Sequence, residues 1–493
     1  MGADAKTAER NAPLDMGVDE FREAGHALVD QLADFLTTLP ERPVVPRSAP
    51  RAARRVLGDA PLPGEGAAAG DLLARTTDLL ADHSLFNSHP KFFGYITSSA
   101  APVGALGELI AAVMNPNLGA VPLSPMASEI EAQTVRWIAE LLRYPVDCGG
   151  LLVSGGNVAN FIGFLAARRA AADWDIREKG LAPGRPMTVY CSAGTHTWIQ
   201  KATDLFGLGT DAVRWIATDS DHRMDMTALR AAIAVDRNQG FQPLLVVGTA
   251  GTVSTGTVDP LREIAALCEQ EGIWFHIDGA YGALAAVLDD APADLHALGL
   301  ADSIAVDPHK WLYAPIEAGC ALVREPRHLV DAFSFQPEYY FFGSGEDRPV
   351  NYHELGLQNS RGFRALKVWL GLQVAGKSGC AEMIGDDIEL ARRLHQLVDE
   401  HPEFEARTCE LSITTFRYVP PDGRLRGEAL NDFNQTLLVE LQEDGRCYPS
   451  NAVVEGDFLL RCCVVNFRTQ ASDIDELPEL IASTARGLLE QME

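Results

Sequence analysis

The sequence lacks most features of secreted, membrane-spanning or nucleic-acid-binding proteins. Its nine cysteines form no CxxC pair, and no apolar run approaches the roughly 18 residues of a membrane span. The polar N-terminus has no apolar core of a secretory signal. Basic residues number 41 against 68 acidic ones, and the resulting net charge of −27 disfavours nucleic acid and anionic membranes as partners. We therefore expect a reduced, cytoplasmic protein without a metal site.

The chain of 493 residues is too long for one ordinary core. Its N-terminal part combines two helical patterns with a Pro-, Arg- and Ala-rich stretch at 40–63, which reads as an extended linker. This part is too thin to bury a core alone, so we expect it to pack on a body or on a partner subunit. The predicted organisation is an N-terminal helical segment and linker over 1–89, a large α/β domain over 90–376, and a small α+β domain over 377–493.

Short β-rich runs alternate with helical patterns through the large domain. Apolar strands that alternate with helices indicate a mainly parallel sheet covered on both faces. Ligands of such sheets bind beyond the carboxyl ends of the strands. The runs lie at 187–193, 212–217, 244–251, 274–280, 303–308 and 319–324, and two shorter strands are predicted in the C-terminal domain at 413–419 and 458–466.

Two of the strand ends carry residues that suit a ligand. The run SGGN, with Gly156 and Asn157, stands where a helix begins, and free N–H groups beside glycines can hold an anion. An ordinary N-cap with a tight turn explains the same residues. His196 follows another strand, where a single histidine serves structure as readily as function.

The remaining strand ends carry a glycine-rich loop, a carboxylate and a lysine. The loop at 248–260 lacks the GxGxxG pattern of a dinucleotide site and alone reads as a plain turn. Asp278 ends an apolar strand, so it either caps a loop or pairs with a cationic ligand atom. Lys310, in VDPHKWLYAP, either reaches water or serves as a buried amine.

Together these residues suit pyridoxal phosphate (PLP). The aldehyde of PLP condenses with a lysine amine, its pyridine nitrogen needs a carboxylate, and its phosphate needs a helix start. An imidazole can stack on its ring. If the predicted strands form one sheet, their carboxyl ends bring the lysine, the carboxylate, the helix start and the imidazole to the same edge.

The motifs resemble those of the group II PLP-dependent amino acid decarboxylases, whose members include aromatic-L-amino-acid and glutamate decarboxylases. DPHKW matches the lysine motif of the family, and HIDGAYG places Asp278 at the family's spacing, 32 residues before Lys310. The resemblance covers roughly residues 20–375 and, more loosely, the C-terminal part. It implies an aspartate-aminotransferase-like fold (fold type I) with a mainly parallel seven-stranded sheet, and a homodimer whose N-terminal helices are exchanged.

The resemblance also implies a role for each matching residue. Lys310 would bind PLP covalently, and Asp278 would pair with the pyridine nitrogen. His196 and Ala280 would pack on the two faces of the ring. The phosphate would be bound by Gly156 and Asn157, with His309 beside phosphate and substrate and Thr252 near the cofactor.

On the substrate side, HPKFFGYITSS resembles a family segment and places Tyr95 and Thr97 near the substrate, together with His196. The stretch 335–354 resembles the family's active-site loop. In that loop Tyr339 stands 29 residues after Lys310 and matches the tyrosine that protonates the substrate carbon. Long loops of this kind are usually either functional lids or disordered segments.

The pocket departs from the aromatic decarboxylases at several positions. Asn87 replaces a tryptophan, Ile96-Thr97-Ser98 replaces Phe-Pro-Thr, and Ile316 replaces an aromatic residue. An aromatic L-amino acid remains the favoured substrate for decarboxylation to amine and CO₂. The alternatives are a small acidic or aliphatic substrate, and aldehyde synthesis or carbon–carbon lysis on the same fold. A non-catalytic binding protein is disfavoured because the catalytic set is complete.

Overall fold

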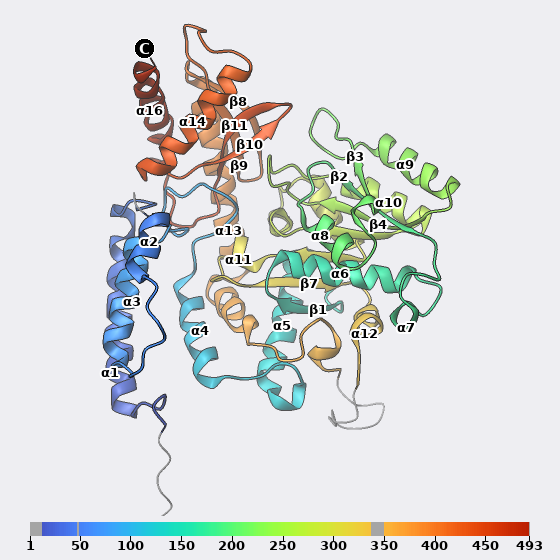
Figure 1. Cartoon of the computed structure of the whole chain (residues 1–493). Helices are drawn as coiled ribbons and strands as arrows, with labels where there is room; N and C mark the ends of the chain where they lie inside the picture. The colour runs from blue at the N-terminus through green and yellow to red at the C-terminus, as the bar shows by residue number, and fades with distance from the viewer. Residues whose placement is uncertain (1–11, 47–48, 337–349, 493) are drawn as a thin grey trace, which may run out of the picture.

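The computed structural model describes residues 12–46, 49–336 and 350–492. Figure 1 shows three parts: N-terminal helices along one side, a large sheet with its helices, and a C-terminal unit above them. In the described ranges, no helix is both long and apolar enough to cross a membrane. The N-terminal helices are α1 (Val18–Thr38), α2 (Ala49–Leu57) and α3 (Ala69–His83).

The prediction of an extended linker over residues 40–63 is wrong for Ala49–Leu57, which form helix α2. This stretch is rich in alanine and arginine, which are strong helix formers. Its proline, Pro50, is the second residue of the helix, where the missing N–H has no intrahelical partner to lose. The linker therefore contains a short helix between α1 and α3, which themselves contact each other.

The large sheet has seven strands in the order β1-β7-β6-β5-β4-β2-β3. β7 is antiparallel to both of its neighbours, and the other pairs are parallel, which confirms a mainly parallel seven-stranded sheet. The sequence indicated six of these strands but not β1, a five-residue strand that begins with two glycines. The strands are β1 (Gly149–Val153), β2 (Met187–Ser192), β3 (Val213–Ile216), β4 (Gln242–Thr249), β5 (Trp274–Asp278), β6 (Ser303–Val306) and β7 (Gly319–Val323).

Helices cover both faces of this sheet, as the apolar strands predict. In β4, Leu245 and Val247 pack with α6 and α8, whereas Val246 between them packs with α5, α9 and α10. Adjacent strand residues point to opposite faces, so an uninterrupted apolar run needs cover on both sides. The helices of this region are α4 (Pro102–Met114), α5 (Pro125–Leu141), α6 (Gly156–Ala171), α7 (Ile176–Lys179), α8 (Trp198–Leu205), α9 (Met226–Asn238), α10 (Leu261–Glu271), α11 (Pro308–Trp311), α12 (Arg327–Phe333) and α13 (Arg364–Glu400).

β1 forms one edge of the sheet, and a buried ion pair binds its main chain. Glu131 accepts the N–H of Leu152 at 2.9 Å, and Arg361 donates to the carbonyl of Leu152 at 2.7 Å. Glu131 and Arg361 also pair with each other, and both side chains are almost fully buried. The edge strand that leads into the SGGN turn is thus fixed by side chains from two distant segments.

The C-terminal unit is a four-stranded antiparallel sheet in the order β10-β11-β9-β8. β9 and β11 were expected from the sequence, and β8 and β10 were not. Helix α13 enters this unit after a break at Gly376, whose φ is 63°. The elements are β8 (Phe404–Glu410), β9 (Ile413–Tyr418), β10 (Ser450–Val454), β11 (Asp457–Cys463), α14 (Glu428–Asp444), α15 (Ala471–Asp475) and α16 (Leu477–Gln491).

Candidate active site

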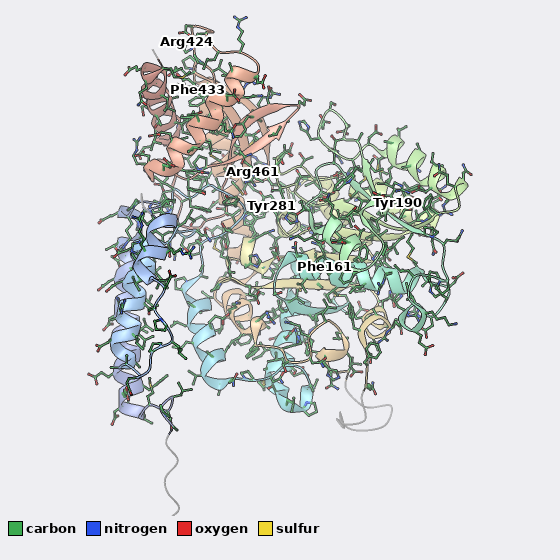
Figure 2. All side chains as sticks on the ribbon, in the orientation of Figure 1. Phe161, Tyr190, Tyr281, Arg424, Phe433 and Arg461 are labelled. Atoms are coloured by element: carbon green, nitrogen blue, oxygen red, sulfur yellow. The ribbon has the colours of Figure 1, made fainter. Side chains whose placement is uncertain are left out.

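A cavity of about 400 Å³ lies beyond the carboxyl ends of β5 and β6 and at the start of α6. One wall is Tyr281, labelled in Figure 2 where the large sheet meets the C-terminal unit. Its ring stacks on Trp311 with 4.7 Å between centroids, and its hydroxyl lies 2.7 Å from that of Ser412 in the C-terminal unit. The C-terminal unit therefore holds this wall in place, although none of the described lining residues belongs to that unit.

The turn between β1 and α6 brings main-chain N–H groups to the cavity. Gly155 has a φ of 127°, which side chains strongly disfavour, and Gly156 is the first residue of α6. A Cβ atom on Gly156 would lie 2.7 Å from Oδ2 of Asp307 and 3.2 Å from Cβ of Ala280. The absence of side chains leaves the helix start open to an anion.

Asp278 is the last residue of β5 and is 6% exposed. Its Oδ2 accepts the indole N–H of Trp198 at 2.7 Å, and its Oδ1 accepts the N–H of Ala280 at 3.2 Å. These donors stabilise a buried carboxylate, which would otherwise be costly. Each oxygen keeps a lone pair for a ligand in the cavity.

His196 lies between β2 and α8 and lines the same cavity. Its Nδ1 accepts the main-chain N–H of Trp198 at 3.3 Å, which leaves the proton of the neutral ring on Nε2. Burial lowers the pKa of His196, against the opposing effect of the Asp278 charge. The imidazole is therefore neutral at neutral pH and suits stacking on an aromatic ring.

Lys310 lies in α11, the one-turn helix that follows β6. Its Nζ is 3.1 Å from Oδ2 of Asp307, a buried carboxylate on the same turn. Nδ1 of His309 lies 2.7 Å from the carbonyl of Ala318, and burial lowers the pKa of His309. The lysine amine is thus held inside the cavity beside its own counter-charge.

The next two aromatic residues after Lys310 fix this turn. Trp311 donates its indole N–H to Asp387 at 2.9 Å, and Tyr313 donates its hydroxyl to the same carboxylate at 2.7 Å. Asp387 is a buried residue of α13 and also accepts the N–H of Asn466 at 3.3 Å. The segment that carries Lys310 is thereby attached to the C-terminal unit.

Most of the predicted site residues meet in this cavity, and a few do not. Thr252 is absent from the cavity lining, is buried, and its hydroxyl lies 2.8 Å from that of Thr255. Tyr95 is 59% exposed, and its carbonyl accepts from Arg461. Tyr339 lies outside the described residues. Those that line the cavity are Gly156, Asn157, His196, Asp278, Ala280, His309 and Lys310.

Thr97, another predicted substrate contact, is also absent from the lining. Its hydroxyl is buried without a hydrogen-bond partner in the part of the chain that the structure describes. The neighbouring Ile96 lines the cavity instead. The segment HPKFFGYITSS thus contributes an apolar side chain to the cavity rather than the predicted hydroxyl.

Asp307 and Val253 line the cavity without having been predicted from the sequence, whereas Ile96 was expected in the pocket only as a departure from the aromatic decarboxylases. Asp307 stands three residues before Lys310, which is one helical turn, so its proximity could have been found from spacing. No local pattern brings Ile96, more than 200 residues from Lys310, to the same cavity.

The residues present fit PLP. The helix start with Gly155 and Gly156 leaves room where side chains would block a phosphate, and Asp278 offers an anion to a pyridine nitrogen. Lys310 supplies an amine and His196 a flat neutral ring in the same cavity. This fold and this set of groups define a PLP-dependent enzyme of fold type I.

Comparison with known proteins places the chain within that class. Residues 50–419 match the family described as the pyridoxal-dependent decarboxylase conserved domain. The chain belongs to this pyridoxal-dependent decarboxylase family, and it is an amino acid decarboxylase that uses PLP.

Several relatives match this chain almost end to end. An aromatic-L-amino-acid decarboxylase of Bacillus atrophaeus is 31% identical over 474 residues, which cover 96% of this chain and 97% of that protein. A tyrosine decarboxylase of Oryza sativa subsp. japonica is 32% identical, with 98% and 94% covered. The crystal structure of Oryza sativa TDC with PLP and tryptamine superposes with a TM-score of 0.89 at 26% identity, covering 97% of this chain and 100% of that one.

The glycine at the start of α6 gives the first test of the PLP site. Gly156→Ala should force Asp307 away from the helix start, and an overpacked site of this kind costs about 1–3 kcal/mol. We expect PLP to bind the variant roughly tenfold to a hundredfold more weakly. Titration of the cofactor-free protein with PLP measures this. Gly487→Ala in α16, where a Cβ meets nothing within 4 Å, is the control, and equal affinities in the two variants would contradict the assignment.

Proposed function

We propose that this enzyme removes the carboxylate of an aromatic L-amino acid and releases the corresponding amine and CO₂. The observation that carries the proposal is the single cavity that joins Lys310, Asp278, His196 and the start of α6. The two relatives at 31% and 32% identity act, by their names, on aromatic amino acids and on tyrosine.

Each group in the cavity has a proposed task. When bound, PLP accepts the electron pair that the departing CO₂ leaves behind. Lys310 would hold the cofactor through its amine nitrogen. Asp278 would keep a proton on the pyridine nitrogen, and His196 and Ala280 would pack against the ring. The N–H groups at Gly156 and Asn157, with His309, would bind the phosphate.

The lining of the cavity supports an apolar substrate side chain. Ile96 and Val253 are apolar, and Lys310 is the one lysine or arginine among the described lining residues. An acidic side chain would need a cationic partner of its own in a buried site, so the acidic alternative is disfavoured. An aliphatic substrate is the competing proposal, because Ile96 and Val253 would suit it too.

The substrate proposal is tested by measuring CO₂ release and amine formation with PLP and each of the twenty amino acids. We expect the highest kcat/KM with an aromatic amino acid. The highest value with an aliphatic amino acid would replace the proposal with its competitor, and the highest value with aspartate or glutamate would reject both.

Aldehyde synthesis is the second candidate activity, because phenylacetaldehyde synthases of Arabidopsis thaliana and of a rose cultivar are 28% and 27% identical to this chain. Tyr339 distinguishes the two reactions, since its proposed task is to protonate the substrate carbon. Tyr339→Phe should shift the product from amine towards aldehyde. Chromatography of both products measures the shift, and amine output equal to that of the unaltered enzyme would reject the role of Tyr339.

We also propose a homodimer with the organisation 1–89, 90–376 and 377–493. Apolar side chains stand exposed on α4, and α1 has no buried residue, so both helices have faces that a second copy could cover. The exposed side chains of α4 are Leu106, Leu109, Ile110, Val113 and Met114. Light scattering should give twice the chain mass of 53.3 kDa, and a mass of one chain would refute the dimer.

All nine cysteines are free thiols, which supports the proposed cytoplasmic location.

A further inference from the structure

Trp198, the first residue of α8, contacts both side chains that are proposed to hold the PLP ring. Its indole N–H donates to Oδ2 of Asp278 at 2.7 Å, and its main-chain N–H donates to Nδ1 of His196 at 3.3 Å. The side chain is fully buried. One residue therefore links the carboxylate that is proposed to pair with the pyridine nitrogen to the imidazole that is proposed to pack on the ring.

The two donors on Asp278 fix the plane of its carboxylate. The N–H of Ala280 comes from the loop after β5, and the indole N–H comes from a different element, α8. Rotation of the carboxylate would break both hydrogen bonds in a site that is 6% exposed. We propose that Trp198 is a positioning residue for the cofactor, whose indole N–H holds the Asp278 carboxylate in the orientation that meets the pyridine nitrogen. The inference rests on the proposed role of Asp278.

The indole is itself held by a neutral network. Its ring meets that of His276 edge-on, with centroids 5.5 Å apart. Nε2 of His276 lies 2.7 Å from the amide oxygen of Asn160, and Nδ1 lies 2.7 Å from the hydroxyl of Ser303. Burial lowers the pKa of His276 to about 4, so this ring carries no charge that would compete with the cofactor for Asp278. The Trp198 ring therefore packs against an uncharged imidazole that is itself fixed by two hydrogen bonds.

A positioning role through Asp278 makes a specific prediction about the ring nitrogen. Trp198 should matter for binding PLP and should matter little for 1-deazapyridoxal 5′-phosphate, in which a carbon replaces the pyridine nitrogen. A merely structural role would weaken both ligands equally. The preference for PLP over the deaza analogue thus isolates the contact between Asp278 and the nitrogen.

The experiment is calorimetric titration of the cofactor-free full-length chain with each of the two ligands. We expect the unaltered protein to prefer PLP by about tenfold or more, the scale of a charge-assisted hydrogen bond. Trp198→Phe should lose most of that preference while its affinity for the analogue changes by less than about threefold. Trp369→Phe removes an indole hydrogen bond to Gln133, and neither residue lines the cavity, so this variant is the matched control and should keep the preference.

The possible results separate the inference from the proposed function. A preference in Trp198→Phe equal to that of the unaltered protein overturns the role of Trp198, as does an equal loss for both ligands. No preference in the unaltered protein overturns the proposed role of Asp278 and the inference with it. If the phenylalanine variant does not fold, 3-benzothienylalanine at position 198 retains the bicyclic shape without the N–H and gives the same comparison.

Discussion

Lys310→Ala is expected to abolish the covalent link to PLP and to lower the rate of decarboxylation by about 10³-fold or more, the scale on which loss of a catalytic group slows an enzyme. The cavity contains no second lysine among its described lining residues, so no other amine there can replace it. The unaltered protein should be yellow after PLP is added. Peptide mass spectrometry after borohydride reduction should find the cofactor on Lys310 and nowhere on the variant.

The variant should still bind PLP without a bond, because Asp278, His196 and the start of α6 remain. Lys179→Ala, an exposed lysine of α7, is the control and should keep both colour and rate. Full activity in Lys310→Ala would disprove the assignment. An unaltered protein that stays colourless in the presence of PLP would disprove the whole active site.

Asp387→Ala is expected to lower the free energy of unfolding by about 3 kcal/mol. It leaves three buried donors, from Trp311, Tyr313 and Asn466, without their acceptor, and each unpaired buried group costs roughly 1–3 kcal/mol, partly offset because the buried charge is removed as well. Urea unfolding measures the change. Asp386→Ala alters the exposed neighbour and should change stability by less than about 0.5 kcal/mol. Equal midpoints for the two variants would contradict the argument.

The same residue predicts a dependence on pH. Burial raises the pKa of Asp387 to about 7, against the opposing effect of its hydrogen-bond donors, whereas an unfolded aspartate has a pKa near about 3.9. The folded chain then holds this proton more tightly, so the contribution of Asp387 to stability falls as pH rises from about 4 to about 7. Asp387→Asn should remove this fall. Urea midpoints of the unaltered protein and of Asp387→Asn are measured at about pH 5 and at about pH 7. The same change in midpoint between the two pH values in both proteins would refute the prediction.

The proposed cofactor-binding side of the cavity could be predicted from the sequence because its groups stand at strand ends or at a helix start. Asp278 ends β5, Lys310 follows β6, and Gly156 begins α6, and strand ends converge in a mainly parallel sheet. The spacing of 32 residues between Asp278 and Lys310 then matched that of the PLP-dependent decarboxylases. The covalent chemistry of PLP requires this combination of groups, so a chemical constraint supplemented a modest local signal.

The substrate side could not be predicted in the same way. Ile96 reaches the cavity through a segment without regular structure, whose path depends on packing against the C-terminal unit: the N–H of Phe93 donates to the carbonyl of Tyr448. Thr252 was placed beside the cofactor by resemblance, yet its hydroxyl lies within a chain of buried threonine hydroxyls. Strand β1 escaped notice because five residues starting with two glycines carry little β propensity.

The ion pair on β1 has a consequence for association between molecules. An edge strand with free N–H and C=O groups is a template for another strand, and proteins with such edges aggregate through them. Here a strand that approached Leu152 would have to displace Glu131 and Arg361 and leave two buried charges without partners. Such a loss costs several kcal/mol. The pair thus protects the edge of the sheet from unwanted growth, beside the turn where the phosphate is proposed to bind.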